Sequence, residues 1–323
     1  MTNKLSLWRR SLLIVVALIA GGCRSVMPSA PPVTFTTEEW KFGTSNGSLL
    51  TSEHYKIYTT CRSKPFVNAL PTFVEQCWDA YAEMLPPQHL PMQPLETYLF
   101  QSRWEWERFT ERFSPTRAET YKHIRSGGYS ERGVTVSHYS MARSALSVLA
   151  HEGLHQYLDV THGPNIPAWI NEGLACYFES FDLDDHNRPT FKPENNTLRI
   201  PALRETLASG KLIPLRDILS THAGAEIQKN IQHVSTYYAQ EWAIVVYLMS
   251  DPRNNPYHQG FRAMLRDLGS DAMDHRARGH LAADIDGSMS SGEAIFRAYI
   301  SDDLDRFEVA FHDFVERFLN LQS

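Results

Sequence analysis

The stretch Ser144-Ala-Leu-Ser-Val-Leu-Ala-His-Glu-Gly-Leu-His-Gln-Tyr-Leu158 predicts a helix with one buried face, because its apolar residues recur at helical spacing. His151 and His155 are four residues apart and therefore lie on the same face of this helix. Their imidazoles can bind one zinc ion at about 2.0–2.1 Å. Glu152 then lies beside the metal, where it can accept a proton from a water molecule that the metal activates.

A second predicted helix, Pro167-Ala-Trp-Ile-Asn-Glu-Gly-Leu-Ala-Cys-Tyr-Phe178, starts at a proline suited to a first helical turn. Catalytic zinc needs a third protein ligand and an open position, and Glu172 is the candidate. Each helix contains one interior glycine, Gly153 or Gly173, at a cost of about 1 kcal/mol relative to alanine. We expect the two helices to cross at these glycines, which would bring Glu172 to the histidines.

The alternative interpretation makes His151 and His155 ordinary polar residues of a half-exposed helix and Glu172 a surface carboxylate. With fourteen histidines in the chain, one accidental His-Glu-x-x-His has a probability of about a few per cent. Coincidence with the second helical motif favours the metal site. We therefore expect one zinc ion per chain.

The pairing of His151-Glu-Gly-Leu-His155 with Asn171-Glu-Gly-Leu-Ala175 resembles the gluzincin metallopeptidases. The chain is most similar, over about residues 95–250, to a poorly characterised bacterial group with a peptidase-MA-like domain. This resemblance implies a zincin-like α+β fold, Glu172 as third ligand and hydrolysis of peptide bonds. It also implies that the sheet edge before the metal helix holds an extended substrate. Residues Gly128–Val136 form either this strand or an ordinary inner strand.

Metal-assisted hydrolysis also needs a donor to the oxyanion of the tetrahedral intermediate. The resemblance points to Tyr238, because related peptidases place a tyrosine or histidine from a later helix over the metal. Tyr237, His233 and His222 are alternatives.

Other polar residues could support the site. A carboxylate should orient one of the ligand histidines, and Asp159 and Glu179 are both candidates. Cys176 is either a buried neighbour of the site or a small apolar core residue, and the core interpretation is favoured. Cys61 and Cys77 either form a disulfide, which an oxidising periplasm permits, or stay reduced.

Residues 1–22 have the pattern of a signal peptide. Three basic residues precede the apolar run Leu12–Ala20, and Gly21-Gly22-Cys23 follows. These small residues resemble a bacterial lipoprotein cleavage site with Cys23 lipidated. A transmembrane anchor is the alternative, but nine apolar residues are too few when a membrane span needs about twenty. By resemblance to lipoprotein sorting, Arg24 favours the outer membrane, with the protein facing the periplasm.

Residues 23–34 form the predicted lipidated cysteine and a proline-rich tether. The whole chain has a net charge of −6, and loss of the three basic residues in the signal peptide makes it −9. No basic stripe or arginine-rich segment is present, which argues against a nucleic-acid partner. Lipid on Cys23 would hold this acidic protein to the membrane.

The mature chain is expected to have an α/β lobe at 35–180 and a mainly helical lobe at 181–323, with the cleft between them. Residues 50–60 and 95–100 have strand character, and Phe66–Leu85 and Ser102–Phe113 have helical character. The predicted helices of the second lobe are Ile200–Ser209, Leu215–Leu219, Thr236–Met249, His258–Leu268 and Gly292–Phe318.

These observations predict a lipid-anchored zinc metallopeptidase of the bacterial envelope that acts on a peptide or protein substrate. His151, His155 and Glu172 would bind zinc, Glu152 would act as general base and Tyr238 would stabilise the oxyanion. One alternative is an inactive zincin-fold lipoprotein that binds peptides or glycans. Another is a structural envelope lipoprotein whose zinc joins two helices. No sequence feature specifies the substrate or the oligomeric state.

Overall fold

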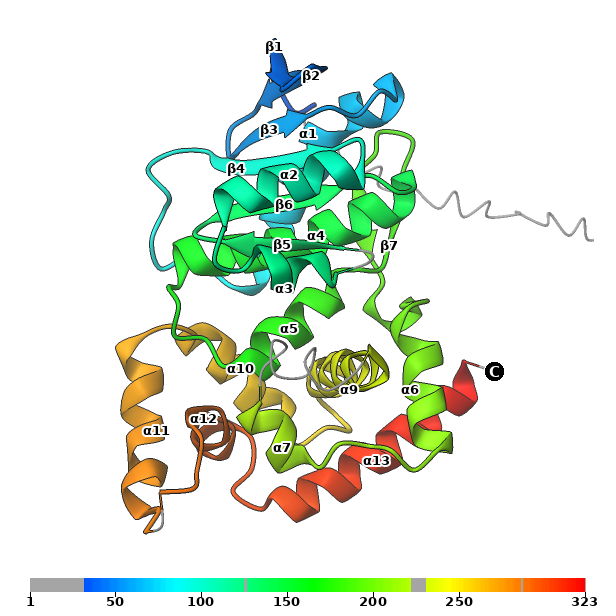
Figure 1. Cartoon of the computed structure of the whole chain (residues 1–323). Coiled ribbons are helices and arrows are strands. Elements are labelled where there is room, and N and C mark those ends of the chain that lie inside the picture. The colour runs from blue at the N-terminus through cyan, green and yellow to red at the C-terminus, as the bar shows by residue number, and fades with distance from the viewer. Residues whose placement is uncertain (1–31, 125–126, 222–230, 286, 323) are drawn as a thin grey trace, which may run out of the picture. The chain divides into compact units, whose positions relative to one another are not determined.

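A six-stranded mixed sheet occupies the upper part of Figure 1, in the order β1-β2-β3-β4-β6-β5. The central strands β3, β4 and β6 run parallel, whereas β1, β2 and β5 are antiparallel to their neighbours. The bounds are β1 Thr36–Phe42, β2 Ser45–Thr51, β3 Tyr55–Thr59, β4 Leu95–Phe100, β5 Gly128–Glu131 and β6 Val134–His138.

This computed structural model describes residues 32–124, 127–221, 231–285 and 287–322. The residues from Val33 onward form one compact unit. The predicted signal peptide, Cys23 and the tether up to residue 31 lie outside the described residues, as does His222. No helix in the described ranges is long and apolar enough to span a membrane.

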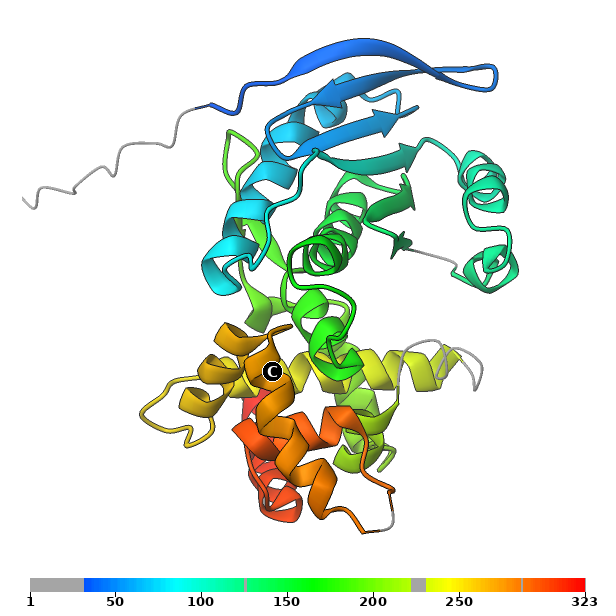
Figure 2. The ribbon, with the colours of Figure 1, turned by 90° about the vertical axis from the view of Figure 1, so that its left-hand side faces the viewer.

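Helices cover both faces of the sheet because parallel strands need crossover connections. Helix α1 (Lys64–Met84) links β3 to β4, and α4 (Ala142–Thr161) packs on the same face. Helices α2 (Arg103–Phe113) and α3 (Ala118–Lys122) lie on the opposite side, as Figure 2 shows. Strands β3 and β4 bury alternate residues against α1 and α4, which fixes their register.

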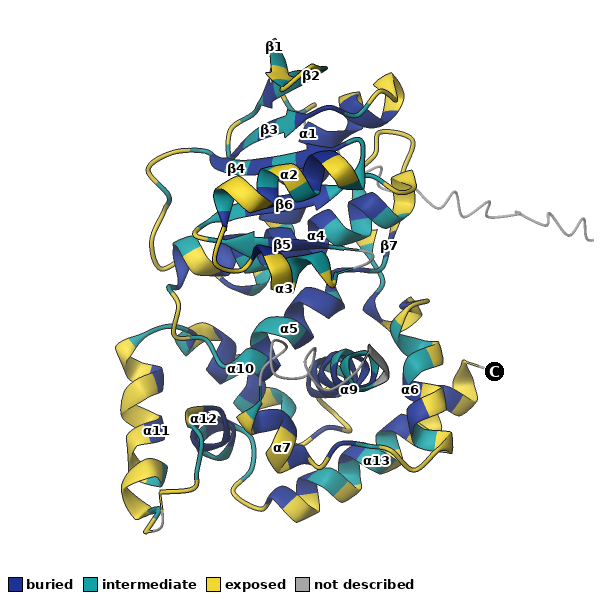
Figure 3. Cartoon of the chain, in the orientation of Figure 1, coloured by how far each residue is buried: buried dark blue, intermediate teal, exposed yellow. Residues whose placement is uncertain are grey.

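The chain leaves the sheet through α4, passes into α5 (Ala168–Tyr177) and continues in helices that fill the lower part of Figure 1. Helix α5 packs against α9 (Ile231–Met249), the buried central helix of this region in Figure 3. The remaining elements include the hairpin β7 (Phe181–Leu183) and β8 (Pro189–Phe191) and a short turn of helix at Pro193–Asn195. The other helices are α6 Arg199–Ala208, α7 Leu215–Ser220, α10 His258–Asp267, α11 Asp271–Ala283, α12 Ser291–Tyr299 and α13 Leu304–Leu321.

The structure confirms the predicted α+β class and corrects several elements. Residues 50–60 span parts of two strands, because the chain turns between β2 and β3. The single helix predicted over Gly292–Phe318 is two helices, and the side chain of Asp303 caps the second by accepting from the Arg306 N–H. Pro167 is the residue before α5, not part of its first turn. Strands β1, β7 and β8 and helices α3 and α11 were not predicted.

Of the two alternatives considered for Cys61 and Cys77, the structure supports reduced thiols, since both cysteines are free. Cys77 is buried on α1 in the main core, and the Cys61 Sγ lies 4.0 Å from the carbonyl oxygen of Leu99. Each thiol therefore has its own packing partners.

The hairpin β7–β8 begins just after the predicted boundary at residue 180 and packs toward α1, with the rings of Phe73 and Phe181 5.0 Å apart.

Candidate metal centre

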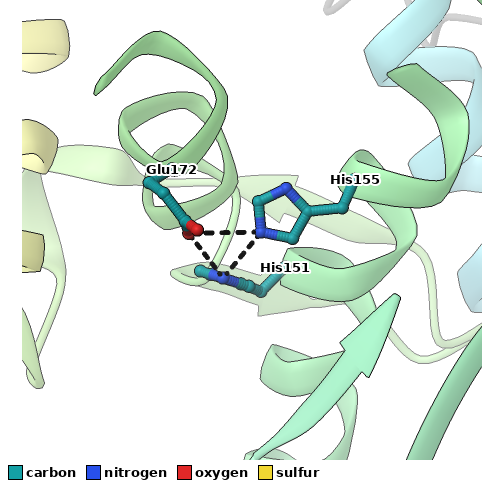
Figure 4. Close-up of side chains that lie close together, drawn as sticks. All are labelled: His151, His155 and Glu172. Atoms are coloured by element: carbon teal, nitrogen blue, oxygen red, sulfur yellow. Dashed lines mark hydrogen bonds and ion pairs between the residues drawn. The ribbon is translucent and has the colours of Figure 1, made fainter. Parts of the chain in front are cut away.

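His151 and His155 on α4 and Glu172 on α5 point toward one another (Figure 4). The two imidazole Nε2 atoms are 3.2 Å apart. Glu172 Oε2 lies 3.5 Å from His151 Nε2 and 3.2 Å from His155 Nε2. Tetrahedral zinc with bonds of 2.0–2.1 Å separates its ligand atoms by about 3.3–3.4 Å. The triangle therefore has the size that a single zinc ion requires.

The chemistry of the three atoms also fits a cation. Both histidines use Nδ1 for other partners, so each Nε2 lone pair faces the triangle. Glu172 Oε2 is buried and has no hydrogen-bond partner among the residues that the structure describes. Three electron-rich atoms this close repel one another unless a positive charge lies between them. Two imidazole nitrogens and a carboxylate oxygen are ligands that zinc commonly takes.

The pKa values respond to the same crowding. Burial lowers the pKa of His155, but the facing Glu172 carboxylate outweighs burial and raises it above its ordinary value. Burial likewise opposes protonation of His151, while the neighbouring side chains of Cys176, Glu172 and Glu179 raise its pKa well above 6.5. Glu172 keeps a lowered pKa despite its burial because both imidazoles face it. The site thus favours a carboxylate surrounded by positive charge.

Glu179 orients His151, and Asp159 does not. The Glu179 Oε1 atom accepts from His151 Nδ1 at 3.0 Å, and Glu179 is buried at the end of the α5 segment. Asp159 is exposed on α4. Burial raises the pKa of Glu179, but Arg199 and His151 lower it to about 2, so this carboxylate stays ionised at neutral pH. Of the two carboxylates considered from the sequence, only Glu179 contacts a candidate ligand.

Asn171 orients His155, a role that the sequence analysis missed. Its side-chain Oδ1 lies 2.8 Å from His155 Nδ1 and accepts a hydrogen bond from this nitrogen. The residue directly precedes Glu172 in the second motif, so one helix provides both a candidate ligand and the partner of another. Its place in the motif was the available signal, because partners of metal-binding histidines are often carbonyl oxygens.

Glu152 lies on α4 beneath the edge of the sheet. It is buried, and burial raises its pKa above 4.5, which increases its affinity for a proton. Gly128 on β5 lies directly above it, since a Cβ at this position would come 3.2 Å from Glu152 Cγ and 2.8 Å from the Val136 carbonyl oxygen. Only glycine permits this close approach of strand and helix.

The sheet order shows which part of Gly128–Val136 is an edge strand and which part is an inner strand. Among the residues that the structure describes, strand β5 is the last strand of the sheet and pairs with β6 alone, so Gly128–Glu131 is an edge. Val134–His138 is an inner strand between β4 and β5. The segment therefore contains one strand of each kind, and the edge strand is the one that passes over Glu152.

The two helix glycines do not lie at a crossing of α4 and α5, contrary to expectation. Gly153 faces α1, where an added Cβ would come 3.3 Å from the Tyr81 hydroxyl. Gly173 faces α9, where it would come 2.7 Å from Val245 Cγ2 and 2.8 Å from the Glu241 carbonyl oxygen. Each glycine thus makes room for a third helix, which holds its own ligand-bearing helix in place.

Among the candidate oxyanion donors, Tyr238 lies beside His151. Their ring centroids are 6.1 Å apart, and Tyr238 is half-buried. Burial and the nearby Glu172 carboxylate raise its pKa well above 10, so it stays a hydroxyl donor at neutral pH. Tyr237 is fully buried in the core. His233 lies more than a turn earlier on α9.

Cys176 is fully buried and also neighbours the site. Its Sγ, a ring nitrogen of His151 and a carboxylate oxygen of Glu179 lie within 4.8 Å of one another. Arg199, however, pairs with both oxygens of this carboxylate, through Nε at 2.8 Å and through Nη2. A cation already satisfies Glu179, so this group does not have the donor set of a second metal site.

A cavity of about 530 Å³ opens beside the triangle. Its lining includes the end of β5 and the following turn, the end of α4 and the loop that leads into α5. His155, Asn171 and Glu172 form part of its wall. The His155 side of the triangle can therefore be reached by a ligand.

A family model described as "Protein of unknown function (DUF1570)" matches residues 145–261. The matched stretch starts in α4 and ends in α10, so it includes all three triangle residues as well as Glu152 and Tyr238. No curated protein matches the chain, and no solved structure matches it.

Proposed function

We propose that this protein is a zinc-dependent peptidase of the gluzincin type with a zincin-like fold. The observation that carries the proposal is the triangle of His151, His155 and Glu172, with separations of 3.2–3.5 Å, beside the buried Glu152. Zinc held there would act as a Lewis acid and lower the pKa of water to about 7. Closed structural sites usually have four protein ligands, whereas this donor set has three and adjoins a cavity.

The side chains around the triangle suit acyl transfer to water. Glu152 would take the proton from the attacking water, since its raised pKa gives the carboxylate a useful affinity for that proton. Tyr238 would donate a hydrogen bond to the oxygen of the scissile carbonyl as negative charge develops there. Strand β5 offers the unpaired main-chain groups of a sheet edge, which can bind an extended peptide of varied sequence.

We also propose that the mature protein is attached to the bacterial envelope through lipid on Cys23. There it would hydrolyse peptides or proteins in the periplasm. The support is the basic and apolar pattern of residues 1–22 and the Gly21-Gly22-Cys23 sequence. Mass spectrometry of the membrane-extracted protein tests this directly. A diacylglyceryl mass on a chain that starts at Cys23 is expected, and an unmodified Cys23 would contradict lipidation.

Substitution of Glu152 by glutamine tests the function. Glu152→Gln keeps the size of the side chain and removes the base, so zinc should stay bound while turnover falls at least about 100-fold. The assay supplies zinc and a mixture of peptides of known sequence, and mass spectrometry detects new termini. Glu83→Gln, an exposed carboxylate change on α1, is the matched control and should retain full activity.

The outcome also separates the rival functions. Cleavage by Glu152→Gln at the wild-type rate would contradict the proposed mechanism. Binding of peptides or glycans with no cleavage by the wild-type protein would instead favour a binding module. Zinc that stays inaccessible to small ligands, and whose removal unfolds the protein, would favour a structural role.

A further inference from the structure

The side chain of Arg199, the first residue of α6, lies between the partner of His151 and the candidate oxyanion donor. Its Nε donates to Glu179 Oε2 at 2.8 Å, and its Nη2 donates to Glu179 Oε1. The guanidinium carbon also lies 5.0 Å from the centre of the Tyr238 ring. One cation thus contacts the carboxylate through its N–H groups and lies over the ring of the tyrosine.

Arg199 is held firmly in this position. Its side chain is 16% exposed, and the backbone N–H of Arg199 donates to Asn196 Oδ1 at 3.1 Å. The Asn196 amide in turn donates to Glu179 Oε2 at 2.9 Å and to the carbonyl oxygen of Cys176 at 3.1 Å. The start of α6 is therefore tied to the segment that carries Glu179.

We propose that Arg199 is a positioning residue that couples the orientation of His151 to the orientation of Tyr238. This inference rests on the proposed function for the role of Tyr238, although its structural part does not. The forked bond to Glu179 fixes the carboxylate that holds the His151 ring, and the same guanidinium supports one face of the tyrosine ring. Movement of the Tyr238 ring would disturb one contact of Arg199, and movement of the His151 ring would disturb the other through Glu179.

A second arginine offers a matched control. Arg276 on α11 lies 5.0 Å from the centre of the Tyr299 ring, and its Nε is 3.5 Å from Asp267 Oδ2. This arrangement repeats the combination of arginine, carboxylate and tyrosine. None of its members belongs to the candidate site. Arg276→Met therefore removes a comparable contact without touching the proposed coupling.

The first test does not depend on activity. We would label the tyrosines of the full chain with ¹³C, assign the Tyr238 signal from its loss in Tyr238→Phe, and titrate zinc into the protein. In wild type and in Arg276→Met, zinc should shift this signal. In Arg199→Met the zinc-induced shift should largely disappear, and zinc affinity should fall about 10-fold.

Arg199→Lys is a more conservative replacement that still tests the proposal if Arg199→Met folds poorly. Lysine can pair with Glu179 but has no planar fork to lie across the tyrosine ring at the same time. It should therefore restore zinc affinity to within about 3-fold of wild type without restoring the Tyr238 shift. A normal Tyr238 shift in the folded Arg199→Met or Arg199→Lys protein would overturn the proposal.

The second test uses turnover. Arg199→Met should lower kcat about 10- to 100-fold at saturating zinc. In the Tyr238→Phe background the same change should lower kcat less than about 3-fold, because the hydroxyl that Arg199 positions is already absent. If Arg199→Met lowers kcat by the same factor in wild type and in Tyr238→Phe, the two residues act independently and the coupling is overturned. A wild-type protein without turnover would reject the peptidase assignment, while the zinc titration would still decide the structural part.

Discussion

The two histidines of the candidate centre have contrasting surroundings. His151 is bound through Nδ1 to an ionised carboxylate, Glu179, which Arg199 and Asn196 also hold. His155 is bound through Nδ1 to the neutral amide of Asn171 and forms part of the wall of the cavity. One histidine is therefore set in a closed, charged network, and the other lies at the entrance to the site.

This difference indicates that the two sides of the centre have different roles, one in stability and one in access to the metal. The network around His151 has several buried hydrogen bonds and resists movement, because breaking any one of them leaves a buried charge poorly paired. On the His155 side, Nδ1 is hydrogen-bonded to the neutral amide of Asn171, next to the cavity through which a ligand can approach. We expect changes on the His151 side to cost stability and changes on the His155 side to affect mainly metal affinity.

The largest effect should follow from removal of Glu179. Glu179→Ala leaves Arg199 charged and buried without its partner, and we expect a loss of about 3–5 kcal/mol in the free energy of unfolding. Asn171→Ala removes one neutral hydrogen bond and should cost about 1 kcal/mol. Both variants should lose zinc affinity by about 10- to 100-fold, since each releases one imidazole.

Denaturant unfolding of the metal-free variants and competition with a chelator of known zinc affinity measure the two quantities separately. Asp159→Asn, a change of an exposed carboxylate on α4, is the control and should alter both by less than about 0.5 kcal/mol. Equal losses of stability in Glu179→Ala and Asn171→Ala would contradict the expectation that the His151 side contributes more to stability than the His155 side.

The helix glycines should give a smaller difference in the same direction. Gly173→Ala places a Cβ 2.8 Å from a carbonyl oxygen of α9, so backbone must move, at a cost of about 1–3 kcal/mol. Gly153→Ala meets only the Tyr81 hydroxyl at 3.3 Å and gains about 1 kcal/mol of helix propensity, so its net effect should be near zero. Thermal unfolding of both variants compares them, and a greater loss for Gly153→Ala would contradict the described packing.

A further effect should be visible only at acidic pH. The pKa of Glu179 is lowered in the folded protein from 4.5 to about 2, so ionised Glu179 stabilises the fold above its unfolded pKa. This contribution should be lost as the pH falls from about 5 to about 2. In metal-free Glu179→Gln, the free energy of unfolding should therefore fall less steeply over this range than in wild type. Parallel pH curves would show that Glu179 is not held ionised, and Glu83→Gln serves as the control.

Much of the centre could be predicted because helical spacing is a local property. The four-residue separation of His151 and His155 places them together on any helix, and the second motif named Glu172. Tyr238 could be proposed only from the family resemblance, and the structure brings its ring to 6.1 Å from that of His151. The role of Arg199 depends on how α6 packs near the end of α5, which no local pattern encodes.

The errors have the same physical origin. A glycine in a helix shows that something approaches closely, but not which element it is. Gly153 and Gly173 were therefore assigned to a mutual crossing, although they face α1 and α9. The spacing of Cys61 and Cys77 similarly gave no information on the direction of their side chains, and both are free. Packing partners distant in the sequence decided each case.

The most direct test of the proposed metal centre is the zinc content of the purified protein. It is measured by elemental mass spectrometry after zinc is supplied and unbound zinc is removed. We predict about one zinc per wild-type chain and loss of that zinc in a folded His155→Ala variant. No bound zinc in the wild-type chain, or unchanged zinc in His155→Ala, would contradict the proposed centre.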